Sequence, residues 1–134
     1  MTAGYSGTPL AKKLSLKPGQ RAWFDGMPDS VFAEIGDVGL DRLTAPATPI
    51  DAAHIFVTRR VEMEAKLAML RPLLSAAGFI WVSWPKKASK QPTDITEDVI
   101  RAVILPASDL VDVKVCAVDQ IWSGLKLMIR KDQR

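Results

Sequence analysis

Two short apolar runs decide the fold: Ala52-Ala53-His54-Ile55-Phe56-Val57 and Phe79-Ile80-Trp81-Val82-Ser83-Trp84. Both runs are continuous rather than alternating, and both are rich in β-branched and aromatic residues. Runs of this kind are typical of strands that are buried on both faces of a sheet. We therefore predict two fully buried strands, over 52–57 and 79–84.

The segment between these runs has the pattern of an amphipathic helix. Apolar residues recur at the spacing of one helical face, at Met63, Leu67, Leu70 and Leu74. Thr58 is expected to cap the start of this helix, and Ala77-Gly78 to end it. Strand, helix and strand within about thirty residues predict a βαβ unit, in which a right-handed crossover joins two parallel strands.

Weaker elements precede this unit. A turn at 17–19 leads into a short strand over 20–24, and a short helix follows over 28–35. A second, weak strand is expected near 40–43. The first 18 residues contain several glycines and prolines, which predict an irregular arm that packs on the domain or extends from it.

A capping box marks a second helix, after the second apolar run. Asp94 is followed three residues later by Glu97, so Asp94 is expected to cap this helix, with Thr93 as the competing cap. Pro106 is expected to stop the helix because proline has no amide hydrogen and clashes with the preceding turn.

The C-terminal segment has the period-two pattern of a strand. Over 110–118 one predicted face is apolar and the other more polar, with Val111, Val113, Val115 and Ala117 against Asp112, Lys114 and Cys116. Charges on such a strand favour an edge position. A short reversal then leads into 121–131, which completes a hairpin. The predicted fold class is α/β, a Rossmann-like three-layer sandwich with a mostly parallel sheet and a C-terminal antiparallel hairpin.

Composition excludes several classes of protein. With 134 residues, 48% hydrophobic and 25% charged, the chain fits one globular domain over 1–134. No apolar run approaches the roughly 18 to 20 residues that cross a bilayer, and no secretion signal is recognised, so we expect a cytoplasmic protein without membrane contact. Cys116 and His54 are the only residues of their types, which argues against a disulfide scaffold and against a metal site.

The order of predicted elements resembles the C-terminal half of the methyltransferase-like Rossmann fold, and Leu16-Lys17-Pro18-Gly19-Gln20 resembles the lead-in to that fold's first strand. The resemblance implies a shortened relative, because 43–52 is too short for the fold's third strand and helix. Enzymes of this fold bind their cofactor at a glycine-rich turn after the first strand. Here Phe24-Asp25-Gly26-Met27-Pro28 contains one glycine, and Pro28 lacks an amide donor, so our leading hypothesis includes no cofactor.

A closer resemblance covers nearly the whole chain. It rests on three blocks: Gly4-Tyr5-Ser6-Gly7-Thr8-Pro9-Leu10-Ala11-Lys12-Lys13-Leu14, Trp84-Pro85-Lys86-Lys87-Ala88-Ser89, and 110–119 followed by Trp122-Ser123-Gly124-Leu125. These blocks resemble the bacterial family called domain of unknown function 3052. The resemblance supports the fold outline and implies a bacterial protein, but that family carries no assigned activity.

Ligands of open α/β sheets usually bind beyond the carboxyl ends of the parallel strands. The candidate ligand-binding residues at those ends are Asp25, Thr58, Arg59, Trp84, Lys86, Lys87 and Asp94. Lys86 and Lys87 would hold a phosphate or carboxylate, with Trp84 as a stacking surface. The alternative is a solvated loop whose lysines keep the protein soluble, and for Asp94 a helix cap is favoured over a base.

A second basic segment lies near the N-terminus, where the first 24 residues contain no acid and four cations: Lys12, Lys13, Lys17 and Arg21. Tyr5, Lys12 and Lys13 would dock on a partner or form an anion-binding loop, and the alternative is that the arm packs over its own sheet. We interpret His54 and Cys116 as buried structural residues, and the four tryptophans as core residues rather than platforms for nucleic-acid bases.

These residues lead to three hypotheses. The leading one is a non-catalytic binding or interaction module that recognises an anionic ligand or a protein partner through Lys86, Lys87 and the N-terminal arm. The alternative is a small enzyme of methyltransferase-like fold with a nucleotide-like cofactor, such as a methyl donor, contacted by Asp25. A weaker third hypothesis is a nucleic-acid accessory protein. The sequence leaves the oligomeric state open.

Overall fold

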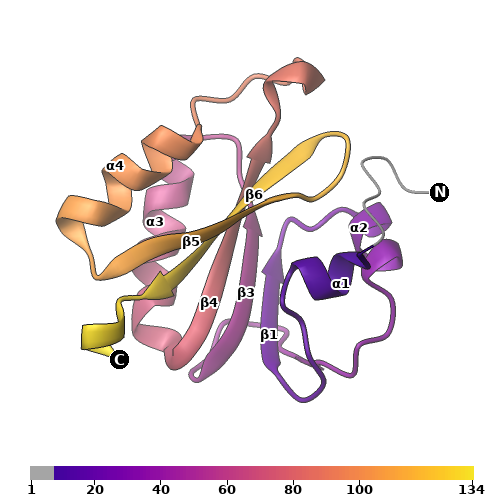
Figure 1. Ribbon diagram of the computed structural model, residues 1–134, viewed down its shortest axis with the longest axis vertical. Helices are drawn as coiled ribbons and strands as arrows, with labels where there is room; N and C mark the ends of the chain where they lie inside the picture. The colour runs from indigo at the N-terminus through magenta and orange to yellow at the C-terminus, as the bar shows by residue number, and fades with distance from the viewer. Residues whose placement is uncertain (1–7) are drawn as a thin grey trace.

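The computed structural model describes residues 8–134, which form a six-stranded sheet between two layers of helices (Figure 1). The strand order is β2-β1-β3-β4-β6-β5. The strands are β1 (Arg21–Asp25), β2 (Asp41–Arg42), β3 (Ile50–Phe56), β4 (Leu74–Pro85), β5 (Leu110–Ala117) and β6 (Trp122–Ile129). The first four strands are parallel to one another, whereas β6 is antiparallel to both β4 and β5. The predicted fold class is therefore confirmed.

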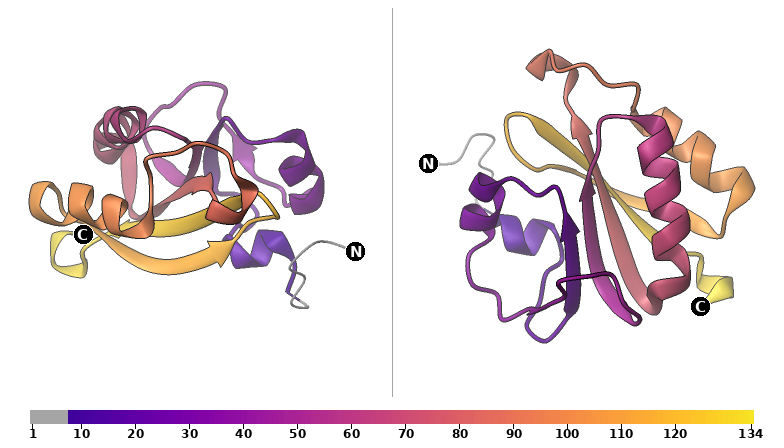
Figure 2. Two further views of the ribbon diagram at one scale, coloured as in Figure 1. Left: turned by 90° about the horizontal axis from the view of Figure 1, so that it is seen from above. Right: turned by 180° about the vertical axis from the view of Figure 1, so that it is seen from behind.

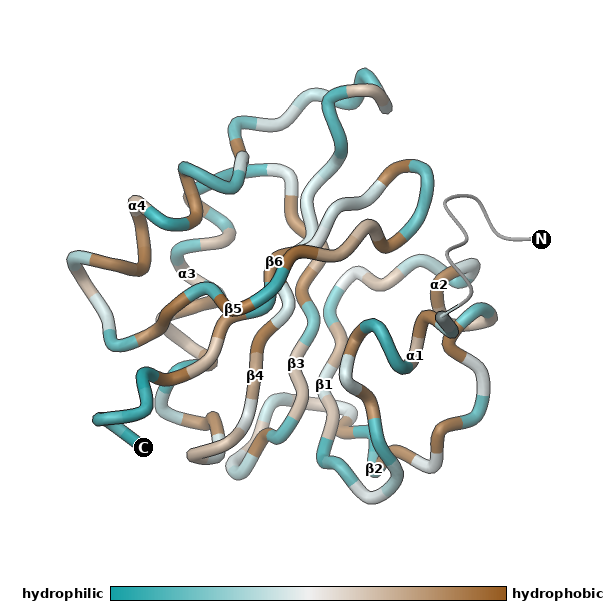
Figure 3. The backbone as a smooth tube through the Cα atoms, in the orientation of Figure 1, coloured by the Kyte–Doolittle hydropathy of each residue, from teal (hydrophilic) through white to brown (hydrophobic). Residues whose placement is uncertain are grey.

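Two helices, α3 (Arg60–Leu70) and α4 (Glu97–Ala107), cover one face of the sheet (Figure 2). Along α4, hydrophobic and hydrophilic residues alternate, as expected of a helix with one buried face (Figure 3). The larger core lies under these helices and joins them to the central strands, with Met63, Leu67 and Leu70 from α3 and Ile100 and Ile104 from α4. In residues 8–134, no helix combines the length and the apolar character that crossing a membrane requires.

The opposite face of the sheet is covered by the short helices α1 (Leu10–Lys13) and α2 (Asp29–Ile35). Leu14, directly after α1, is fully buried, and its carbonyl oxygen accepts a hydrogen bond of 2.9 Å from the indole nitrogen of Trp81 in β4. The described part of the N-terminal arm thus packs back over the sheet, which was one of the two arrangements expected from the sequence.

The connection between α3 and β4 differs from the prediction. The helix ends at Leu70, a 3₁₀ turn, η1 (Arg71–Leu73), follows, and Leu74 begins β4 instead of continuing the helix. The physical reason is Pro72, which cannot donate the next helical hydrogen bond and whose ring clashes with the turn before it. Gly78 was expected to end the helix, but it lies inside β4.

The two helix caps also differ from the prediction. Thr96 caps α4, because its hydroxyl accepts a hydrogen bond of 3.2 Å from the amide of Val99, and neither Asp94 nor Thr93 does so. Thr58 does not cap α3 either, since the residue at the capping position is Arg59. Pro106 lies in the last turn of α4, which ends one residue later.

The predicted apolar face of β5 is wrong. Val113 and Val115 are 52% and 49% exposed, whereas Cys116 of the predicted polar face is buried. The cause is an irregularity in the pairing with β6 between Asp112 and Lys114, where Val113 has no partner. An extra residue in one strand reverses the faces of all residues beyond it. The edge position of β5 is confirmed.

Candidate functional site

The sequence predicts ligand-binding residues beyond the carboxyl ends of the parallel strands, and a small pocket lies beyond that end of β3. Its volume is about 310 Å³, and its lining consists of Thr58, Arg59, Pro92, Thr93 and Asp94. Three of the predicted ligand-binding residues, Thr58, Arg59 and Asp94, are therefore neighbours.

Hydrogen bonds hold the loop before α4 against the start of α3. The hydroxyl of Thr93 donates to the carbonyl oxygen of Thr58 at 2.7 Å. The carboxylate of Asp94 accepts a hydrogen bond of 2.6 Å from the amide of Arg60, in the first turn of α3. Asp94 is thus a helix cap, as expected, but of α3 rather than α4. Its carboxylate already occupies the end of α3 that would attract an external anion.

Removal of the Asp94 cap is expected to lower the stability of the protein. We expect Asp94→Ala to lower the free energy of unfolding by about 1 kcal/mol, because the amide of Arg60 loses its acceptor. Asp94→Asn retains an acceptor oxygen and should keep most of that stability. Urea denaturation of the two variants and the wild type tests this, and equal stability of Asp94→Ala and the wild type would exclude the capping role.

The remaining predicted residues lie apart from this pocket. The carboxylate of Asp25 is ion-paired with the ammonium of Lys66 in α3. Trp84 is buried in the core under α3 and α4, so the predicted stacking surface is absent. Lys87 is exposed in the 3₁₀ turn η2 (Lys87–Ser89).

Lys86 does not line this pocket, and its backbone is bonded to the hairpin. Its amide donates a hydrogen bond of 2.7 Å to the carbonyl oxygen of Ile121, just before β6. In β5, the ammonium of Lys114 donates to the carbonyl oxygen of Lys13 at 3.0 Å, so the end of α1 also rests on the hairpin. The two basic segments of the sequence therefore meet at the hairpin. Lys12 is exposed, and Tyr5 lies outside the described residues.

Cys116 lies among these lysines. Burial raises the pKa of its thiol, and the neighbouring ammonium groups of Lys13, Lys114 and Lys86 act in the opposite direction. Because the burial effect is larger, the thiol is protonated near neutral pH and is not an activated nucleophile. This agrees with a structural role for Cys116.

Lys126 extends the group along β6. Its ammonium donates a hydrogen bond of 3.0 Å to the hydroxyl of Ser15 and lies 4.6 Å from the centre of the Phe79 ring. Burial lowers the pKa of Lys126, and the nearby charges of Lys114 and Lys17 lower it further. We refer to five residues as the lysine cluster: Lys13, Lys17, Lys86, Lys114 and Lys126. None of them forms a salt bridge with a carboxylate of residues 8–134.

Sequence reasoning identified Lys13 and Lys86 but not their meeting with Lys114 and Lys126. Lys114 and Lys126 belong to strands in which alternating charge is ordinary, so no local pattern singles them out. One signal was available in principle, because a predicted hairpin places certain residues of its two strands opposite each other. The irregularity in β5 decides that register, and the sequence pattern did not reveal it.

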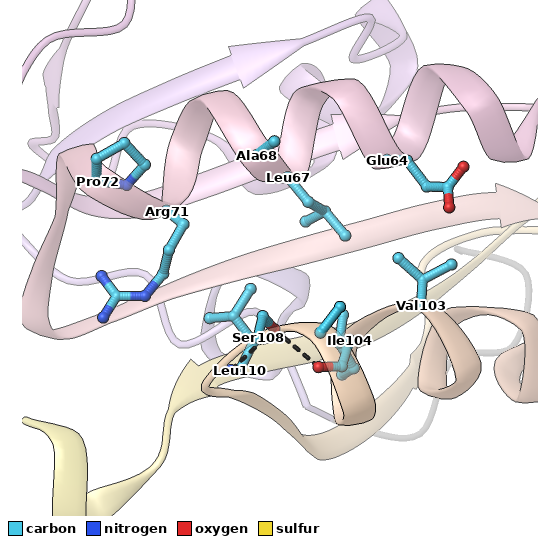
Figure 4. A pocket seen from close by; sticks show the side chains of 10 residues that line it. Glu64, Leu67, Ala68, Arg71, Pro72, Val103, Ile104, Ser108 and Leu110 are labelled. Atoms are coloured by element: carbon cyan, nitrogen blue, oxygen red, sulfur yellow. Dashed lines mark hydrogen bonds between the residues drawn. The ribbon is translucent and has the colours of Figure 1, made fainter.

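A larger, apolar groove of about 410 Å³ lies between α3 and α4. Leu67 from α3 and Val103 from α4 line its opposite sides (Figure 4). At one end, Arg71 binds Asp109 through two hydrogen bonds of 2.6 Å, and this guanidinium lowers the pKa of the Asp109 carboxyl. No candidate residue from the sequence lies in this groove.

His54 is a core residue, as interpreted from the sequence. Its ring is 2% exposed, forms a hydrogen bond of 2.7 Å with the hydroxyl of Ser83, and stacks on Phe56. Within residues 8–134, no group of three or more histidine, cysteine, aspartate or glutamate side chains is arranged to hold a metal ion.

The fold is that of S-adenosylmethionine-dependent methyltransferases. The chain is similar to a SAM-dependent methyltransferase from Aquifex aeolicus, with a TM-score of 0.59, 14% identity, and coverage of 90% of this chain and 87% of that one. It is similar to fibrillarin from Aeropyrum pernix with natively bound S-adenosyl-L-methionine (TM-score 0.56, 12% identity, 93% and 70% covered). A putative methyltransferase from Thermoplasma acidophilum gives a TM-score of 0.53 at 9% identity, with 98% and 77% covered.

At these identities the similarity establishes the fold and no activity. No protein-family model matches the chain, and no curated protein does. The resemblance to the domain of unknown function 3052 family therefore gains no support from the comparisons.

The turn after β1 does not fit the glycine-rich cradle that this fold uses for S-adenosylmethionine. Gly26 is its one glycine, and a Cβ atom there would lie 3.2 Å from the carbonyl oxygen of Phe56, so this glycine serves the packing of the turn on β3. Met27 is buried, Pro28 has no amide hydrogen, and Asp25 is paired with Lys66. With one glycine and no amide donor at Pro28, the turn lacks the close backbone approach and the donors that a glycine-rich cradle supplies to its ligand.

Proposed function

We propose that this protein is a non-catalytic module that binds an anionic ligand at the lysine cluster. One observation carries the proposal. The ammonium groups of Lys13, Lys86 and Lys114, from three distant segments, lie near enough to Cys116 for their charges to act on its thiol, and none of the three forms a salt bridge with a carboxylate of residues 8–134. Ammonium groups that repel one another gain more from a bound anion than isolated, fully solvated lysines do.

The cluster supports an anionic ligand better than the pocket beyond β3 does. In that pocket, Asp94 places a carboxylate against the start of α3, and an incoming anion would meet this negative charge. The lysine cluster presents positive charge only, and each ammonium keeps donors to spare. An ammonium has three N–H donors, of which Lys114 uses one on the carbonyl oxygen of Lys13.

Titration with inorganic phosphate, followed by amide NMR shifts, tests the proposal. We expect saturable shifts around Cys116 that weaken as salt is added, because the attraction is electrostatic. The double variant Lys13→Gln/Lys86→Gln should bind phosphate about tenfold more weakly, a loss of about 1.4 kcal/mol.

The matched control is Lys90→Gln/Lys131→Gln, which removes the same charge at exposed lysines outside the cluster. It should bind phosphate within about twofold of the wild type, since general charge effects are small. The proposal fails if phosphate causes no saturable shifts at low salt, or if the two double variants lose affinity equally.

Two other hypotheses remain as alternatives. An acidic protein partner would engage the same lysines together with Lys12 and Tyr5. A cofactor-dependent enzyme would bind S-adenosylmethionine near Asp25, and shifts at Asp25 rather than Cys116 on adding that compound would favour it. Membership of the domain of unknown function 3052 family, and a bacterial, cytoplasmic setting, also stay predictions.

A further inference from the structure

Lys114 and Lys126 form a cross-strand pair of like charge. They are direct partners in the antiparallel register of β5 and β6, so their side chains leave the same face of the sheet. Residues in this relation have Cβ atoms about 5 Å apart, and like charges there destabilise a sheet. A pair of this kind, without a carboxylate beside it, is a place where a bound anion relieves repulsion.

Both ammonium groups are already held in place by the protein itself. Lys114 is anchored on the carbonyl oxygen of Lys13, and Lys126 on the hydroxyl of Ser15, each at 3.0 Å. The Phe79 ring beneath Lys126 restrains that side chain further. Since each anchor uses one of three donors, both groups can still donate to an anion. Positioned donors lose less conformational entropy on binding than free ones.

The charge of Lys114 acts on two neighbouring residues. It acts on the Cys116 thiol together with the charges of Lys13 and Lys86, and on the Lys126 ammonium together with the charge of Lys17. We therefore divide the lysine cluster into two groups that share Lys114. A single phosphate can satisfy one of these groups, but two linked phosphates can engage both. Two adjacent phosphates also match the charge of the cluster more closely than one does.

We propose that the ligand carries at least two linked phosphate groups, one bound among Lys13, Lys86 and Lys114 and the next among Lys114, Lys126 and Lys17. This inference rests on the proposed function, which requires only an anion. The shared chemistry is a diphosphate, which free pyrophosphate and a nucleoside diphosphate both contain.

Parallel titrations with inorganic phosphate, pyrophosphate and adenosine diphosphate test the inference. We expect pyrophosphate to bind at least about tenfold more tightly than phosphate. Lys17→Gln/Lys126→Met should remove that advantage, so that this variant binds pyrophosphate no more tightly than phosphate. Methionine resembles lysine in length and its thioether also packs against aromatic rings, so this change removes the charge over the Phe79 ring but retains a side chain that can pack there. Lys17→Gln alone should reduce the advantage in part, and because Lys17 is exposed, this variant does not depend on repacking.

The outcomes separate the two proposals. Equal affinities for phosphate and pyrophosphate would overturn the diphosphate inference and leave the proposed function standing. Binding of neither compound would overturn both. Adenosine diphosphate binding as tightly as pyrophosphate would identify the diphosphate as the recognised part, and much tighter binding would identify a nucleotide as the source. A pyrophosphate advantage that persists in Lys17→Gln/Lys126→Met would overturn the assignment of the second group.

Discussion

Lowering the pH from 7 to 4.5 is expected to reduce the free energy of unfolding by about 2–3 kcal/mol through one buried histidine, His54. Burial lowers the pKa of His54 from 6.5 to about 3. The ring nevertheless has a partner for its Nε2 atom, in the hydroxyl of Ser83. The folded protein therefore holds a neutral imidazole in a site that disfavours its charged form.

The sign of the effect follows from proton binding. Between pH 6.5 and about 3, the unfolded chain protonates His54 and the folded protein does not. Acid therefore favours the unfolded state in this window. The contribution of the neutral His54 to the free energy of unfolding is fully present above pH 6.5. It is lost as the pH falls toward about 3, by up to about 1.4 kcal/mol per pH unit.

The variant His54→Gln isolates this contribution from that of the carboxylates. Its amide can still bond to Ser83, but it does not titrate. Urea denaturation of both proteins at several pH values is the measurement, and the difference between them should change by about 2–3 kcal/mol between pH 7 and 4.5. A difference that is constant over this range would show that His54 is not the responsible group.

Gly78→Ala is expected to destabilise the protein by about 3 kcal/mol, near the upper end of what overpacking costs. A Cβ atom at this position would lie 2.7 Å from the carbonyl oxygen of Ile50 in β3, and 2.9 Å from Leu74 and Ser75 side-chain atoms. The closest atom is backbone of a central strand, so β3 and β4 would have to separate. Because the contact with Ile50 is to a backbone atom, no change of side-chain rotamer can relieve it.

The control for Gly78→Ala is Ala77→Ser, at an exposed neighbouring position of the same strand. This change should alter the free energy of unfolding by less than about 0.5 kcal/mol. Thermal or urea unfolding of both variants provides the comparison. If Gly78→Ala also changes the free energy of unfolding by less than about 0.5 kcal/mol, the space at Gly78 between β3 and β4 is large enough for a methyl group.

The candidate site was predictable only in part. Strand ends in a parallel sheet are fixed by the apolar runs, so the sequence pattern was enough to place Thr58, Arg59 and Asp94 near one another. What Asp94 does there was not predictable, because its partner, the amide of Arg60, lies 34 residues away in sequence. Trp84 shows a different limit. The apolar run over 79–84 predicted a strand buried on both faces, and Trp84 is indeed buried, so the additional prediction that it offers a stacking surface was wrong.

Local sequence was sufficient to specify the βαβ unit, the edge position of β5 and the closing hairpin. The spacing of apolar residues indicates which side of an element is buried, and turn residues indicate where the chain reverses. Both signals lie in residues that are close together in the sequence, so these features could be predicted. Long-range packing placed Lys114 on Lys13, 101 residues away, and opposite Lys126 across the hairpin. These contacts depend on the irregularity in the pairing of β5 with β6 and on how α1 packs over the sheet. Neither feature produces a periodic pattern in the sequence, so neither was predicted.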